Sequence, residues 1–112
     1  MKKMEIIIRP EKFETLKAIL LERNISGMMV SNVMGHGNQY GYTKQYRGNV
    51  YSVNLVNKMK VEVIVLDEVV EDVLSEIHKQ IATGTVGDGK VFVYDVLDVM
   101  RIRTGDRGEK AL

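Results

Sequence analysis

The sequence predicts an α+β fold in which two helices cover one face of an antiparallel sheet. Short runs of β-branched or alternating apolar residues, which are typical of strands, flank two stretches with apolar residues at every third or fourth position. Strand, helix and strand therefore follow one another twice along the chain, as βαβ–βαβ. This order is that of the ferredoxin-like fold. With 112 residues, the chain is expected to form one domain, 1–112.

The first half of the chain contains two predicted strands with a helix between them. A run of isoleucines predicts a strand at residues 3–9, which stops at Pro10. From Pro10 onward the apolar residues recur at helical spacing, and we expect a helix that ends near Asn24. Residues 28–34 alternate between two faces, which predicts the second strand.

The second half repeats this order. Alternation at residues 50–55 and 59–65 predicts one long strand, or two strands in line, at the third position of the sheet. Asp67 is expected to cap a helix with an apolar face. The fourth strand is predicted at residues 91–96, with an extension through residues 99–102.

Composition excludes several classes of protein. Without cysteine, the chain has neither a disulfide framework nor a thiolate metal site. Its two histidines, His36 and His78, lack metal-ligand spacing, so a zinc site is not expected. The net charge of +1 gives no general attraction to nucleic acid or to an anionic membrane. No apolar run resembles a signal peptide or a membrane span, and we expect a cytoplasmic protein.

A long segment without core periodicity occupies residues 35–49. It contains four glycines and three tyrosines, and loops of this length tend to be functional or disordered. Its first glycines approach the dinucleotide-binding pattern G-x-G-x-x-G, but Tyr40 stands at the last glycine position and no helix follows. A Rossmann site is therefore not expected, and a loop with one polar side chain, Gln39, remains.

A second glycine-rich segment, residues 83–90, nearly matches the phosphate loop G-x-x-x-x-G-K-[S/T]. Val91 lacks the required hydroxyl, and the segment leads from a helix into a strand rather than the reverse. A P-loop NTPase is therefore excluded. Three glycines can still expose backbone N–H groups to an anion beside Lys90, and the alternative is a tight turn with an exposed lysine.

Two arginines near the C-terminus are candidates for a phosphate contact. In a strand, Arg101 and Arg103 would point the same way, and paired guanidinium groups bind phosphate well. An exposed charged edge is the alternative interpretation. The sequence contains no evident nucleophile with a base partner, so a catalytic triad is not predicted.

Taken together, these segments resemble the PII family of nitrogen-regulatory signal-transduction proteins, over the whole chain. The strongest likeness is TGTVGDGKVFV at residues 83–93, which is similar to the family's C-terminal signature. The second is YRGNVY at residues 46–51, which is similar to the loop signature Y-R-G-x-x-Y. The resemblance implies a homotrimer of ferredoxin-like subunits that acts as a regulator and not as an enzyme.

The resemblance also implies how such a protein meets its targets. Residues 37–53 would be the T-loop, with Arg47 as a target contact and Tyr51 as a possible modification site. The implied partners are an ammonium transporter, glutamine synthetase or a nitrogen-regulating transcription factor. The membrane would be reached only through a transporter.

The implied ligands are ATP or ADP, and 2-oxoglutarate together with Mg-ATP. Residues 83–90 and 102–109 would be the B-loop and C-loop, which close a nucleotide cleft between neighbouring subunits. By resemblance, the nucleotide contacts are Gly35, Gly37, Glu62, Ile64, Gly87, Asp88, Gly89, Lys90, Arg101 and Arg103. The 2-oxoglutarate contacts are Gln39, Gly41, Lys58 and Gly87, and Gln39 would also contact Mg²⁺.

The chain departs from the family pattern at three places. Asn38 stands where the family usually has arginine, Met29 where threonine is common, and Asn49-Val50 where a small residue and an acid are common. Asn38 keeps open a PII-like sensor of a different small ligand. A weak ATPase that uses the same cleft is the second alternative.

Overall fold

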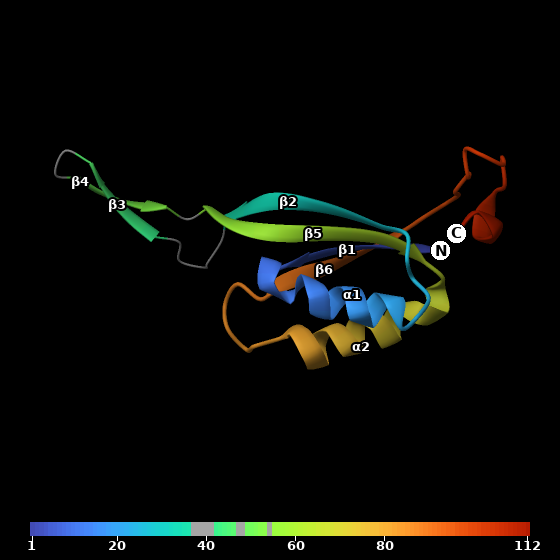
Figure 1. Ribbon diagram of the computed structural model, residues 1–112, viewed down its shortest axis with the longest axis horizontal. Coiled ribbons are helices and arrows are strands. Elements are labelled where there is room, and N and C mark those ends of the chain that lie inside the picture. The colour runs from blue at the N-terminus through green and yellow to red at the C-terminus, as the bar shows by residue number, and fades with distance from the viewer. Residues whose placement is uncertain (37–41, 47–48, 54) are drawn as a thin grey trace.

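The computed structural model describes residues 1–36, 42–46, 49–53 and 55–112, and for 42–46 and 49–53 it describes the backbone alone. The main sheet has the strand order β2-β5-β1-β6, and all neighbouring pairs are antiparallel. Its strands are β1 (Lys2–Ile8), β2 (Met28–His36), β5 (Leu55–Val65) and β6 (Gly89–Asp95). Both helices lie on the same face of this sheet, so the predicted ferredoxin-like fold is confirmed (Figure 1).

The first helix begins as predicted and ends slightly earlier. A 3₁₀ turn, Pro10–Lys12, leads into α1 (Phe13–Leu21). The chain then turns at Asn24, whose φ of +60° is the left-handed conformation that commonly ends a helix. Among the described residues, no helix has the length and apolar character that crossing a membrane requires.

The second helix, α2 (Val70–Ile81), follows a 3₁₀ turn at Asp67–Val69. The expected capping role of Asp67 is wrong, because its side chain makes no capping hydrogen bond. Instead, its Oδ1 lies 2.9 Å from the N-terminal amine of Met1. The carboxylate therefore ties the start of the chain to the start of this helix.

The core lies between the helices and the sheet. Alternate residues of β1 and β5 point into it, as the sequence pattern predicts, and both helices contribute their apolar faces. The buried side chains are Met4, Ile6, Ile8, Leu16, Ile19, Leu20, Val61, Val63, Val65, Val70, Val73, Ile77 and Ile81. Met28, Met59 and Val91 of the strands also pack against this core, and the alternate strand residues face away from the helices and form the uncovered face of the sheet.

The third strand differs from the prediction. Residues 50–53 do not belong to the main sheet, because β4 (Asn49–Val53) pairs with β3 (Tyr42–Tyr46) in a separate two-stranded sheet. Of the residues predicted for the third strand, only those of β5 belong to the main sheet. The expectation of an unstructured segment at residues 35–49 is also wrong in part, since β2 extends to His36 and β3 lies within it. Alternation identifies a strand but does not specify its partner.

The fourth strand ends earlier than expected. Its partner β1 begins at Lys2, which pairs with Asp95, so the sheet has no strand beside residues 99–102. Met100 makes only an isolated bridge with Arg107. The expectation that Arg101 and Arg103 point the same way from a strand is therefore wrong.

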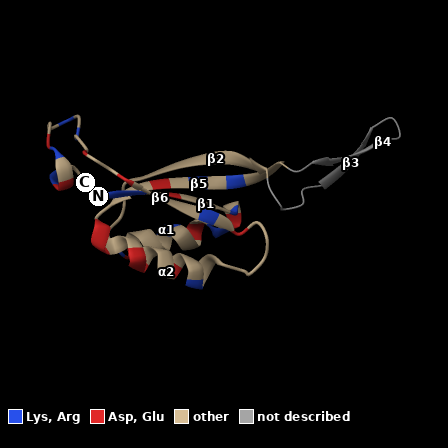
Figure 2. Cartoon of the chain, turned by 180° about the vertical axis from the view of Figure 1, so that it is seen from behind, with Lys and Arg blue, Asp and Glu red and all other residues tan. Residues whose placement is uncertain are grey.

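Charged residues of both signs occur on the helices, on the sheet and on the C-terminal segment (Figure 2). On the uncovered face, Lys3 lies 3.0 Å from Glu62, and Lys60 lies 3.4 Å from the same carboxylate. These contacts lower the pKa of Glu62, chiefly through Lys3. On the uncovered face, one carboxylate is thus shared by a lysine of β1 and a lysine of β5.

Candidate functional site

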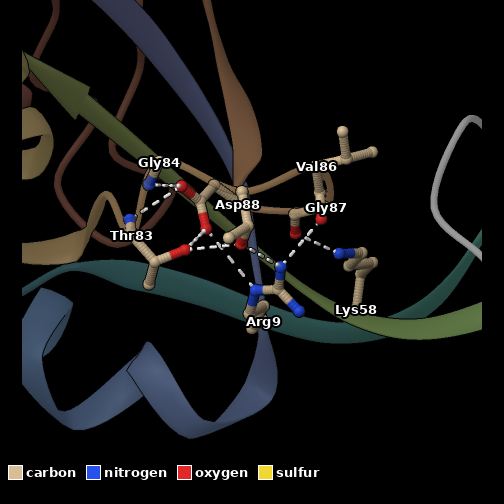
Figure 3. A network of polar contacts seen from close by, with 8 residues as sticks. Arg9, Lys58, Thr83, Gly84, Val86, Gly87 and Asp88 are labelled. Atoms are coloured by element: carbon tan, nitrogen blue, oxygen red, sulfur yellow. Dashed lines mark hydrogen bonds and ion pairs between the residues drawn. The ribbon is translucent and has the colours of Figure 1, made fainter.

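The loop of residues 83–88, between α2 and β6, is closed by one carboxylate (Figure 3). Asp88 accepts hydrogen bonds from the Thr83 hydroxyl at 2.5 Å, from the Thr83 N–H at 2.7 Å and from the Gly84 N–H at 3.0 Å. These donors, with the Thr83 hydroxyl first, lower the pKa of Asp88 to about 2. Since the carboxylate is fully engaged within the loop, it is poorly suited to act as a general base.

Arg9 contacts the same loop from the end of β1. Its Nη2 donates to Thr85 Oγ1 at 3.1 Å and to Val86 O at 2.9 Å, and its Nε lies 3.5 Å from Asp88 Oδ1. The sequence reasoning did not select this residue. The available signal was an arginine directly after the first predicted strand. A β-α-β-β-α-β order places this end of the first strand beside the second glycine-rich segment, residues 83–90.

Lys58 approaches the loop from β5. Only 8% of its surface is exposed, and it is the one buried charged residue of the described part of the chain. Its Nζ donates to Gly87 O, and no described carboxylate forms an ion pair with it. Burial, and secondarily the charge of Arg9, lower the pKa of Lys58. A buried ammonium with a neutral partner is an unfavourable arrangement that an anionic ligand would improve.

Gly89 is required by the fold. Its φ is +110°, and a Cβ atom at this position would lie 1.8 Å from Ile7 O. The glycine therefore allows β6 to pair closely with β1. Gly84 and Gly87, with φ of +82° and +102°, shape the loop itself. Lys90 follows on β6 with an exposed side chain.

The structure brings several predicted contacts to this end of the sheet. Gly35 of β2 borders Lys58, since a Cβ atom at Gly35 would lie 3.4 Å from Lys58 Cγ. Glu62 and Ile64 lie farther along β5, and strand alternation places them on the same face as Lys58. Glu62 and Ile64 therefore share a face with Lys58 but lie farther than Lys58 from the loop 83–88.

The C-terminal segment, which contains the predicted phosphate contacts Arg101 and Arg103, begins at the end of the sheet opposite to the loop 83–88 (Figure 1). Since a strand rises about 3.3 Å per residue, the seven residues of β6 put roughly 20 Å between the loop and the start of the C-terminal segment. There, Arg101 lies 3.6 Å from Asp106 and donates to Leu112 O at 3.2 Å. One chain therefore does not bring Arg101 or Arg103 to the loop.

Several predicted residues cannot be placed. Gly37, Gln39, Gly41 and Arg47 lie outside the described residues. Tyr51 belongs to β4, of which the backbone alone is described. In the described part of the chain, no group of three or more histidine or acidic side chains has the geometry of a metal site. The proposed Mg²⁺ contact, Gln39, is not among those residues.

A pocket of about 440 Å³ lies between α2 and the strands β1 and β6. Its walls are mostly apolar, and the loop 83–88 closes one end. Three predicted nucleotide contacts border it: Asp88, Gly89 and Lys90. Neither Lys58 nor Arg9 does, although Arg9 contacts Thr85 and Asp88, which line the pocket.

Known proteins match the chain over its whole length. The family model "Nitrogen regulatory protein P-II" matches residues 1–106. The chain is 46% identical to the nitrogen regulatory protein P-II of Pasteurella multocida (strain Pm70), with 100% of both chains covered. It is 43% identical to nitrogen regulatory protein P-II 1 of Escherichia coli (strain K12), again over 100% of both chains.

The solved structure of GlnK from B. subtilis superposes with a TM-score of 0.80 at 38% identity, over 99% of this chain and 97% of that one. A ferredoxin-like sheet with a glycine-rich loop at one end thus agrees with full-length sequence similarity. The chain belongs to the nitrogen regulatory protein P-II family, whose members are regulatory signal transducers.

Proposed function

We propose that this P-II protein is a homotrimeric, cytoplasmic sensor that binds ATP or ADP competitively, and 2-oxoglutarate together with Mg-ATP. Each ligand would favour one conformation of the T-loop, residues 37–53, and so change the affinity for a target. The targets proposed are an ammonium transporter, glutamine synthetase or a nitrogen-regulating transcription factor, with Arg47 as a contact. Tyr51 is proposed as a possible modification site.

The observation that carries this proposal is the buried ammonium of Lys58. It lies beside the loop 83–88 with a carbonyl oxygen as its described hydrogen-bond partner. A carboxylate of 2-oxoglutarate would replace that neutral acceptor with an opposite charge, which is a much better partner for a buried cation.

The cleft is proposed to lie between two subunits. Gly35, Gly37, Glu62, Ile64 and Gly87–Lys90 of one subunit would face Arg101 and Arg103 of its neighbour. A second copy is needed because the loop and the arginines of one chain lie at opposite ends of the sheet. Exposed apolar side chains support the assembly: Leu97 and Ile102 are 98% and 90% exposed.

The contact of Asp88 with a nucleotide is proposed to run through its backbone N–H. Its carboxylate is engaged by Thr83 and Gly84 and carries the same sign of charge as a phosphate. Gly87, Gly89 and Lys90 would complete the phosphate contacts of this subunit.

Binding of 2-oxoglutarate should depend on Mg-ATP. The dicarboxylate and the phosphates repel one another, and Mg²⁺ bound with ATP supplies the positive charge that offsets this repulsion. Gln39 is proposed to contact that ion, and Gly41 and Gly87 to contact 2-oxoglutarate. Lys58 would bind its distal carboxylate.

Calorimetric titration tests the proposal. We expect 2-oxoglutarate to bind with Mg-ATP present, and to bind weakly or not at all with ADP or without nucleotide. By linkage, 2-oxoglutarate should raise the affinity for ATP by the same factor by which ATP raises the affinity for 2-oxoglutarate. Equal affinity for 2-oxoglutarate in all three conditions would contradict the model.

The same experiments address the two alternatives. A PII-like sensor of another ligand would bind nucleotide with no response to 2-oxoglutarate. A weak ATPase would turn over ATP far above background, with the activity lost in Lys90→Ala. We expect neither, because Lys58 is retained beside the loop and the Asp88 carboxylate is occupied.

A further inference from the structure

The side chain of Arg9 joins the loop 83–88 to the end of β1. Arg9 bonds to Thr85 Oγ1 at 3.1 Å and to Val86 O at 2.9 Å, and lies 3.5 Å from Asp88 (Figure 3). It follows Ile8, the last residue of β1, so its backbone starts from a buried strand. A planar guanidinium carries five N–H donors and can bridge acceptors on both limbs of a loop.

These contacts also orient two peptide units of the loop. Val86 O points to Arg9, and Gly87 O points to Lys58. In a trans peptide unit the N–H points away from the carbonyl oxygen, and none of the described peptide bonds is cis. The N–H groups of Gly87 and Asp88 therefore point away from the two cations. Adjacent N–H groups with a shared direction form a concavity that binds anions.

Nη2 and Nε of Arg9 thus both face acceptors of the loop itself. We infer that Arg9 is a positioning residue that holds the loop 83–88 in the conformation that binds phosphate, without contacting the nucleotide. The inference rests on the proposed nucleotide site and adds a residue to it. The loop then pays little ordering cost when the nucleotide binds, because its N–H groups are already aligned.

Two variants with matched losses test this role. Arg9→Met removes the contacts to the loop, and Arg23→Met removes a comparable set elsewhere, since Arg23 pairs with Asp72 and donates to Ile19 O at 2.9 Å. We expect Arg9→Met to weaken ATP about tenfold in calorimetry and Arg23→Met to leave it within twofold of wild type. Both should keep the oligomeric size of wild type.

A second measurement separates positioning from direct contact. Without nucleotide, the amides of Thr83 and Gly84, which donate to Asp88, should exchange hydrogen at least tenfold faster in Arg9→Met than in wild type. Weaker ATP binding with unchanged exchange would mean that Arg9 contacts the nucleotide or acts by its charge, and would overturn the inference. Unchanged ATP affinity would also overturn it.

Thr85→Val provides a test that does not depend on the folding of Arg9→Met. It removes one acceptor of the guanidinium, together with the contact of Thr85 Oγ1 to Thr83 Oγ1 at 2.7 Å, and leaves the charge of Arg9 in place. We expect ATP to bind about threefold more weakly and the Gly84 amide to exchange faster. An effect of charge alone predicts no change, and that result would overturn the inference. Failure of wild type to bind ATP would contradict the proposed function, and the exchange rates would still report whether Arg9 orders the loop.

Discussion

Two loops of this protein are closed by the same kinds of residue, but the arginine that contacts each loop comes from a different part of the fold. In the loop 83–88, a threonine, an aspartate and glycines with positive φ are joined by Arg9, which comes from a buried strand. In the turn 101–107, Thr104 donates to Asp106 at 2.9 Å, and the arginine that joins them, Arg101, belongs to the turn itself.

The difference appears in the exposure of the ion pairs. The side chains of Arg9 and Asp88 are each 22% exposed, whereas those of Arg101 and Asp106 are 36% and 46% exposed. A loop held by a distant element is fixed to the sheet before any ligand arrives. A turn closed by its own residues has no such attachment and, under the proposed function, acquires its role only beside a second subunit.

The largest effect is expected at the point where the first loop joins the sheet. In Gly89→Ala the new Cβ would meet Ile7 O, so β6 must separate from β1. We expect a loss of more than about 4 kcal/mol of stability, or failure to fold. Gly105→Ala in the second turn, where φ is +76° and the space is open, should cost only about 1–2 kcal/mol.

Thermal unfolding at equal protein concentration measures both variants. Similar unfolding temperatures for Gly89→Ala and Gly105→Ala would remove the distinction between the two loops.

The next effect concerns the buried cation beside the first loop. Lys58→Met should abolish 2-oxoglutarate binding and leave ATP within about threefold of wild type. Without ligands, the variant should unfold at or above the wild-type temperature, because an apolar side chain replaces a buried charge that has no described ionic partner.

Lys60→Met is the matched control on the same strand and face, where the lysine pairs with Glu62. It should retain 2-oxoglutarate binding. Loss of binding in both variants would point to a general effect of charge on this face.

A smaller effect is expected in the second turn. Arg103→Ala should weaken ATP about tenfold with the trimer intact, since a hydrogen bond to a charged group contributes about 1.5–3 kcal/mol. Arg107→Ala, which removes an ion pair with Asp98 in the same segment, should stay within about twofold. Calorimetry and size measurement together decide this, and an unchanged ATP affinity in Arg103→Ala would exclude the arginine from the cleft.

The smallest effect depends on pH. The pKa of Asp88 is lowered from 3.8 to about 2, so its contribution to stability is present above about pH 4 and is lost as the pH falls toward 2. Wild type should therefore be more stable than Asp88→Asn at neutral pH, and the difference should shrink between pH 4 and pH 2. A difference that stays constant over this range would argue against an ionised Asp88 as the closing group of the loop.

Sequence patterns predicted most of the fold because they report local periodicity. Alternation and helical spacing identified the strands and helices of the main sheet, including β5 and α2. They could not identify the partner of β4, because a period of two specifies faces and not pairing. They also extended β6 too far, since the end of a strand depends on where β1 begins.

The glycine-rich loop was predicted from its motif, and its tertiary contacts were not. Arg9 and Thr85 are separated by more than seventy positions and meet only because β1 and β6 are neighbours in the sheet. The burial of Lys58 likewise depends on Gly87 crossing its end of β5. Neither contact is specified by residues that are adjacent in the sequence.

Under the proposed function, the first loop of one subunit and the second turn of its neighbour form one nucleotide cleft. Mixed trimers of Lys90→Ala and Arg103→Ala subunits test it most directly. In a closed ring, a trimer with two subunits of one variant and one subunit of the other keeps one cleft in which both Lys90 and Arg103 are present. We predict one site of wild-type ATP affinity per mixed trimer and none in either pure variant. Mixed trimers without any recovered site would contradict the account.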